Sequence, residues 1–166
     1  MFPGGPFLFD ALQYCNAALA LLVTLRPRTD PNALRVYVRT RDERTYREIP
    51  APPKEEFWAA CACADVPVAY LSATTQPAAA LVLYRCELPV PALHPLPEPR
   101  MEGEHARVWL CALHSASSDG AHLLVTAGIQ PKPAPDGGYT IRFVLGQFAV
   151  ASGAISVVAE LPATFA

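Results

Sequence analysis

Short apolar runs separated by proline and glycine dominate the chain, and this pattern predicts a protein built from strands. The clearest strand is 34–40, where Leu34, Val36 and Val38 share one face and the intervening residues share the other. After a polar turn, 45–49 is the predicted antiparallel partner of this strand.

The same pattern of apolar runs separated by proline and glycine predicts further strands. They are expected at 17–26, 66–72, 79–88, 107–115, 122–129, 139–150 and 155–161. Residues 88–100 contain five prolines, which lack the donor that a central strand needs. We therefore expect 88–100 to be an extended internal connector along the surface or an edge.

Two short segments are predicted to be helical. In the N-terminal segment 1–16, Leu8, Leu12 and Cys15 have helical spacing, so we expect a helix over 8–15. The apolar run that follows it could be a helix or a buried strand, and we place a strand there. A second helix is expected to start within 51–58, because proline is tolerated in a first turn and two glutamates suit the positive helix end. It should end near Cys63.

These elements predict a mainly β fold for a single domain, 1–166. The economical solution is an antiparallel sandwich or a jelly-roll-like barrel of about eight strands with one or two short helices. A small α+β domain is the alternative. Of the 166 residues, 52% are hydrophobic and 17% are charged, which is enough to bury a core and excludes bulk disorder.

Charge and composition narrow the class of protein further. The net charge of −2 does not indicate a general polyanion binder, so nucleic acid is an unlikely partner. No basic residue precedes Arg26, and no apolar stretch is long enough to span a membrane, which predicts an intracellular protein without a secretory signal. With 18 prolines, five cysteines and only two lysines among 13 basic residues, the composition suggests a GC-rich DNA virus.

The sequence contains no convincing catalytic or metal-binding motif. Cys61-x-Cys63 and Cys111-x-x-His114 could each offer two zinc ligands, but positions i and i+3 of a strand point to opposite faces. There is no G-x-S-x-G elbow and no phosphate-binding glycine loop. We therefore expect no catalytic site, no metal and no cofactor.

Arginine is concentrated in one segment. Seven of the eleven arginines lie between Arg26 and Arg47, and this stretch is our candidate partner-binding surface, because guanidinium groups pair with oxyanions and stack on aromatic rings. The candidate residues are Arg35, Tyr37, Arg39, Arg41, Arg44 and Arg47. The competing interpretation is an ordinary solvent-facing hairpin.

The C-terminal half resembles a known family. The runs LYRCELPVPALHPLP, ARVWLCALHSAS and GAISVVAEL resemble, in order, the trimeric dUTPase β-barrel, and are most similar to viral dUTPase-related proteins. The resemblance places His114 and Ser115 at the phosphate motif, and Asp136 and Tyr139 at the hairpin that carries the catalytic aspartate and the uracil-site tyrosine. His114 replaces the family arginine and Gln130 stands near the aspartate position, so the resemblance implies a barrel whose nucleotide chemistry is lost.

Three functions follow as expectations. The first is a non-enzymatic protein-interaction module, such as a viral dUTPase-related or accessory protein. The second is a dUTPase-type nucleotide hydrolase that uses His114, Ser115, Asp136 and Tyr139. The third is an oligomeric structural component of a virion, because spare apolar surface marks interfaces.

Overall fold

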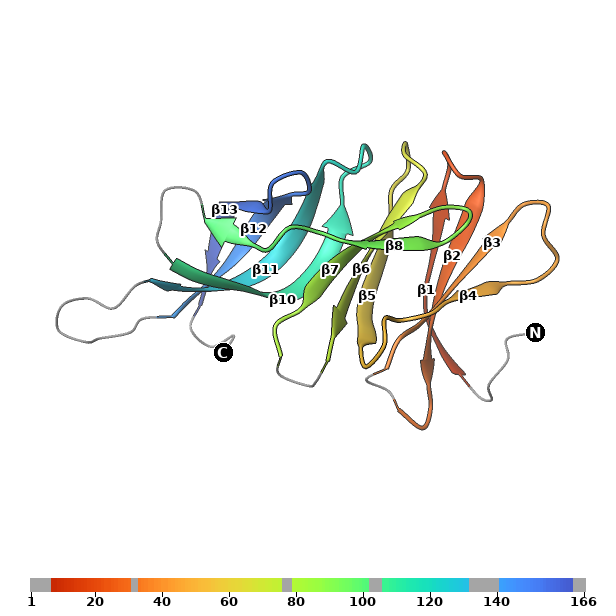
Figure 1. Ribbon diagram of the computed structural model, residues 1–166, viewed down its shortest axis with the longest axis horizontal. Coiled ribbons are helices and arrows are strands. Elements are labelled where there is room, and N and C mark those ends of the chain that lie inside the picture. The colour runs from red at the N-terminus through yellow and green to blue at the C-terminus, as the bar shows by residue number, and fades with distance from the viewer. Residues whose placement is uncertain (1–6, 31–32, 76–78, 102–105, 132–140, 163–166) are drawn as a thin grey trace.

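The computed structural model describes residues 7–30, 33–75, 79–101, 106–131 and 141–162 (Figure 1). These residues form thirteen strands in three sheets, and none of them is helical. The mainly β prediction is therefore confirmed. The two predicted short helices, 8–15 and 51–63, are wrong.

The strands follow the chain from sheet to sheet. The N-terminal sheet, in spatial order, is β1 (Phe7–Cys15), β2 (Ala20–Pro27), β3 (Arg35–Thr40) and β4 (Arg47–Ile49). The middle sheet is β5 (Glu56–Ala62), β6 (Val68–Thr74), β7 (Val82–Glu87) and β8 (Ala92–Pro95). The C-terminal sheet is β10 (Ala106–Ala116), β11 (His122–Pro131), β12 (Arg142–Ala149), β13 (Ala154–Leu161) and β9 (Arg100–Met101).

The middle sheet lies between the other two and supplies both cores, as Figure 1 shows. Strand β6 is buried at every residue. Leu71 packs into the core shared with the N-terminal sheet, whereas Tyr70 packs into the core shared with the C-terminal sheet. Because successive side chains of a strand point to opposite faces, a strand buried on both faces is mainly apolar, and Ser72 and Thr74 are the polar exceptions here.

The C-terminal sheet is curled. Its last member, β9, pairs in parallel with β13 through Arg100 and Met101, and β9 also contacts β10 at the other end of the sheet. The sheet therefore bends toward closure as a half-barrel, with Phe148 and Val144 buried on its concave side. All other pairings in the three sheets are antiparallel.

The segment 8–15 is strand rather than helix, because it pairs along its length with β2, and it carries a β-bulge. Phe9 lies opposite Leu25 and Ala11 lies opposite Thr24, so Asp10 is the extra residue. A bulge shifts the alternation by one position, and two residues three apart then share a face. The residues that suggested a helix divide between the two faces of the strand, because Leu8 and Cys15 lie opposite Arg26 and Ala20, whereas Leu12 lies opposite Val23.

The segment 51–63 is likewise strand over Glu56–Ala62, after a turn in which Lys54 has a φ of 67°. Tertiary contacts override the helix-start signal, because the Phe57 carbonyl accepts a bond from the Leu34 amide in the neighbouring sheet. The proline-rich 88–100 segment contains two short strands, β8 and β9. Both lie at sheet edges, where the missing proline donors cost no ladder bond.

One side chain supplies two of the hydrogen bonds across the seam between the N-terminal and middle sheets. The Gln13 amide donates to the Ala60 carbonyl at 2.9 Å and accepts from the Ala62 amide at 2.7 Å. Ala60 and Ala62 belong to β5, which is an edge strand, so the glutamine occupies the bonding positions of a missing neighbour. The seam is thus bonded through a side chain rather than through a continuous ladder.

We expect Gln13→Ala to lower the free energy of unfolding by about 1–3 kcal/mol, because two partly buried backbone groups lose their partner. Amide exchange at Ala62 should accelerate in the same variant. Gln13→Glu keeps the acceptor for the Ala62 amide and should protect that amide better than alanine does. Equal exchange rates in the two variants would contradict this account of the seam.

Candidate functional site

One broad face of the N-terminal sheet points away from the rest of the protein, and we call it the outer face. Residues opposite one another in neighbouring strands share a face, so the register defines three rows across it. The rows are Phe9–Leu25–Arg35, Leu12–Val23–Tyr37 and Tyr14–Leu21–Arg39. Each row runs from an apolar or aromatic residue of β1, through an aliphatic residue of β2, to an arginine or tyrosine of β3.

The β1 half of the outer face is exposed. Phe9, Leu12 and Tyr14 retain 66%, 55% and 48% of their accessible surface. They are three of the eleven exposed large hydrophobic residues in the described part of the chain, and they share this face. Isolated exposed apolar residues are ordinary, but a contiguous group of them marks a binding surface.

The β2–β3 half of the outer face is covered by the chain itself. Val23, Leu25 and Tyr37 form a small buried cluster, against which Phe7 and Tyr46 pack. Burial raises the pKa of the Tyr37 hydroxyl, and nearby Glu48 raises it further. The exposed apolar residues of β1 therefore lie beside a packed cluster on β2 and β3.

The structure divides the six predicted partner-binding residues into groups. Arg35, Tyr37 and Arg39 share the outer face, but Tyr37 is buried within it. Arg35 forms an ion pair with Glu48 at 2.7 Å, and the Arg39 guanidinium lies 4.9 Å from the centre of the Tyr46 ring.

The other three predicted arginines lie at the turn between β3 and β4. Arg47 pairs with Glu43 at 2.9 Å and donates to the Pro89 carbonyl at 3.0 Å. Arg41 and Arg44 are exposed in this turn. The Arg41 amide donates to the Leu19 carbonyl at 3.1 Å, which fixes the turn beside exposed Leu19. Arg41 and Arg44 are therefore exposed cations, and no ion pair joins them to another described residue.

The sequence reasoning missed the apolar half of this site. The prediction places Phe9, Leu12 and Tyr14 in a helix over 8–15 and gives them no binding role, because the bulge at Asp10 hides their common face. Their strand partners could have revealed it: each stands opposite an aliphatic residue of 20–27 when the two segments are paired as a hairpin.

The alternative nucleotide-site residues are only partly described. His114 and Ser115 are both exposed on the convex side of β10, where a register shift lets adjacent residues share a face. The His114 ring bonds the Thr126 hydroxyl at 2.7 Å, while Ser115 lines a shallow hollow of about 340 Å³ with His122 and Gln147. Asp136 and Tyr139 lie outside the described residues.

The cysteine motifs are not arranged for chemistry. Burial raises the pKa of the Cys61 thiol to about 12 and that of Cys63 to about 11, so both are protonated thiols at neutral pH. Cys61 packs in the core, whereas Cys111 is exposed on β10. Within the described ranges, no three histidine, cysteine or acidic side chains converge where they could hold a metal.

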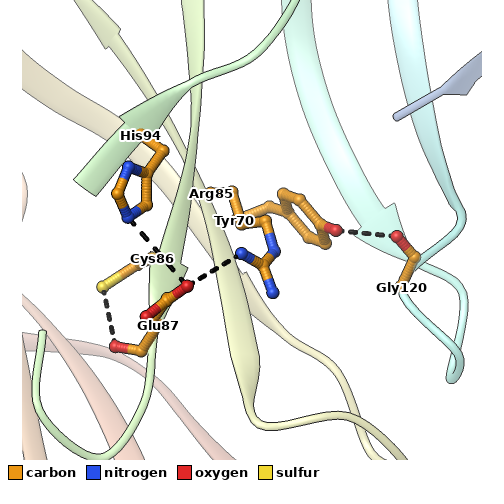
Figure 2. A network of polar contacts seen from close by, with 6 residues as sticks. All are labelled: Tyr70, Arg85, Cys86, Glu87, His94 and Gly120. Atoms are coloured by element: carbon orange, nitrogen blue, oxygen red, sulfur yellow. Dashed lines mark hydrogen bonds and ion pairs between the residues drawn. The ribbon is translucent and has the colours of Figure 1, made fainter. Parts of the chain in front are cut away.

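A polar network crosses the middle sheet without forming a reactive site (Figure 2). Glu87 pairs with Arg85 at 3.1 Å and lies 4.0 Å from His94, all on exposed surface. Tyr70 donates instead to the Gly120 carbonyl at 2.7 Å, and burial raises its pKa. Its hydroxyl therefore bonds the turn between β10 and β11 and is not presented to a substrate.

A groove of about 380 Å³ opens where the middle and C-terminal sheets separate, between residues 80–83, 96–99 and 107–110. A smaller hollow of about 240 Å³ shares Leu81, Trp109 and Leu110 with it and is also lined by Trp58. Both are mainly apolar, and Glu98 and Arg107 are the charged residues of the larger groove. Their walls could accept an apolar group, but they place no general acid beside a nucleophile.

Comparison with known proteins found no matching family profile and no curated relative. The dUTPase resemblance therefore stays a prediction. None of the described residues belongs to a helix that could cross a lipid bilayer.

Proposed function

We propose that the protein is a non-enzymatic interaction module that binds another protein through the outer face of its N-terminal sheet. The observation that supports this most directly is the set of three rows, which combine exposed Phe9, Leu12 and Tyr14 with arginines on one surface. Aromatic residues and arginine are enriched at protein interfaces, where they contribute most of the binding energy.

The composition suggests the setting in which this module acts. Its proline-rich, lysine-poor sequence suits an accessory protein of a GC-rich DNA virus, and the predicted partner is then a protein inside the host cell. The degenerate dUTPase motifs fit a protein that has kept a binding role after losing catalysis.

A photocrosslinking experiment tests the proposed function. A benzophenone amino acid would replace Leu12, and in a matched control it would replace Val90, which is 68% exposed in the turn between β7 and β8. In animal-cell lysate, we expect the Leu12 probe to trap a discrete protein partner and the Val90 probe to trap none.

A substitution on the same face completes this prediction. In a pull-down without any probe, Leu12→Asp should reduce recovery of the partner that the Leu12 probe identified by about tenfold or more, because a charge replaces an interface side chain in the middle row. Its melting temperature should stay close to that of the parent, since Leu12 is exposed. The same adducts from both probe positions, or capture that is indifferent to Leu12→Asp, would remove the outer face as the binding site.

A further inference from the structure

We infer that the outer face selects an acidic amphipathic segment of its partner, whose apolar side chains cover β1 and whose carboxylates meet the arginines of the β3–β4 turn. This inference rests on the proposed function and specifies the chemistry of the partner. It follows from how charge is distributed over the face.

The hairpin that borders the face is locally basic. Residues 35–49 contain five arginines and three acidic residues, a net charge of +2, in a chain whose net charge is −2. The field at this end of the N-terminal sheet therefore attracts carboxylates, although the protein as a whole is weakly acidic.

Two of the three acids are already engaged. Glu48 pairs with Arg35 at 2.7 Å, and Glu43 pairs with Arg47 at 2.9 Å. Glu43 also accepts bonds from the Thr40 amide and hydroxyl, which lowers the pKa of its carboxyl. These acids neutralise Arg35 and Arg47.

The arginines that Glu43 and Glu48 do not neutralise lie at one end of the face. No ion pair joins Arg41 or Arg44 to another residue in the described part of the chain, and Arg39 stacks on Tyr46. A guanidinium that stacks on a ring keeps its edge N–H groups free to donate to carboxylates. Arg41 and Arg44 are therefore the exposed cations that a partner can meet, and Arg39, whose Nε is buried, can add only its terminal N–H groups.

These cations adjoin the apolar half of the face. Arg39 is in the same row as Tyr14 and Leu21, and the Arg41 amide bonds the carbonyl of exposed Leu19. A segment that packs on Leu12 and Tyr14 thus brings its flanking residues within reach of the turn. Apolar contact and charge pairing would be made by the same short segment.

The dimensions of the face suit one segment rather than a whole domain. Neighbouring strands are spaced by about 4.8 Å, and the exposed apolar residues of the face lie on the edge strand β1, so its open apolar part is a strip of roughly 5–10 Å. One helix, about 10 Å across with its side chains, fits that width. An anionic membrane is a poorer match, because polybasic lipid-binding sites carry about 4–8 basic residues without intervening acids.

The test selects ligands from a random-peptide library displayed on phage, using the full chain as bait and Leu12→Asp for counter-selection. We expect the enriched peptides to combine apolar residues with Asp or Glu and to carry net negative charge. The best peptide is then resynthesised with Lys in place of each acidic residue, and both forms are titrated against the protein at low and high salt.

Charge reversal supplies the decisive comparison. The double variant Arg41→Glu, Arg44→Glu should bind the acidic peptide about tenfold more weakly and should prefer the lysine form. Arg107→Glu, at an exposed site on β10, is the matched control and should change neither affinity. High salt should weaken the acidic peptide on the parent protein.

Several results would overturn the inference while leaving the proposed function in place. Equal affinity for the acidic and lysine peptides would mean that apolar contact alone selects the partner. Failure to enrich any peptide over Leu12→Asp, while the Leu12 probe still traps a partner, would mean that the face binds a folded surface. If the protein co-sediments with phosphatidylserine vesicles and Leu12→Asp abolishes this, the face binds a membrane. If the protein dimerises with increasing concentration and Leu12→Asp abolishes this, the face binds a second copy of the chain. If the Leu12 probe traps nothing, the proposed function itself fails.

Discussion

Phe57→Ala is expected to lower the free energy of unfolding by about 3–5 kcal/mol, the range for removal of a large buried aromatic side chain. Phe57 is 2% exposed and packs in the core between the N-terminal and middle sheets. Its backbone carbonyl also accepts the Leu34 amide, so the residue lies at a direct link between these sheets. A cavity here cannot close easily, because both sheets around it are rigid.

The neighbouring residue provides a matched control for this prediction. Trp58 is larger than Phe57 but is 36% exposed, because it points to the other face of β5. Trp58→Ala should therefore cost only about 1 kcal/mol. Chemical denaturation of both variants measures the difference, and a Trp58 loss as large as that of Phe57 would show that the burial of β5 is misassigned.

Gly153→Ala is expected to have the second-largest effect, a loss of about 2–4 kcal/mol from a strained backbone together with a steric clash. Gly153 has a φ of +74°, and an added Cβ would lie 2.3 Å from the backbone carbonyl oxygen of Glu98. The Gly153 carbonyl accepts the Arg100 amide at 2.9 Å, beside the pairing of β9 with β13. Relief of the clash would pull this parallel pair apart.

Gly120→Ala separates the cost of the left-handed backbone from the cost of the steric clash in Gly153→Ala. Gly120 has a similar φ of +71°, but its nearest contact would be a methyl group of Val66 at 2.9 Å, which can shift. We expect Gly120→Ala to cost about 1–2 kcal/mol, mainly from the left-handed backbone. Amide exchange at Arg100 should accelerate only in Gly153→Ala. Similar losses in both variants, with Arg100 unchanged, would mean that the contact with Glu98 does not matter.

The proposed binding role is consistent with the way the three sheets are used. Strand β6 of the middle sheet is buried on both faces, and the C-terminal sheet curls around a core that it shares with the middle sheet, whereas the N-terminal sheet leaves the β1 half of its outer face exposed. The outer face is therefore a place where further apolar burial can be gained by binding. Its arginines add selectivity for charge rather than much affinity.

Much of the fold could be predicted from the alternation of polar and apolar residues and from the positions of proline and glycine. Val36 and Val38 are buried and Arg35 is exposed, as the pattern of 34–40 indicates. The Asp119-Gly120 turn and the β10–β11 hairpin around it were also evident, because a left-handed turn needs glycine and strands pair across it. Such features are local, so the residues involved are sufficient to specify them.

The two false helices show where local information is insufficient. In β1 the bulge at Asp10 places Phe9 and Leu12 on one face at a spacing of three, and in β5 a second register shift follows Phe57. Whether such a segment becomes a bulged strand or a helix depends on its neighbours. Here Gln13 and Leu34 supply bonds to β5 that a helix could not accept.

The sequence by itself determined that this is a strand-rich protein, and that Arg35, Tyr37 and Arg39 share a face. Only the tertiary structure decided that Phe9, Leu12 and Tyr14 lie on that same face, that Tyr37 is buried within it, and that Arg35 and Arg47 are paired. The physical reason is the sequence separation of the interacting residues. Alternation within a strand is set by neighbouring residues in the sequence, whereas register, bulges and ion pairs depend on which other strand lies alongside.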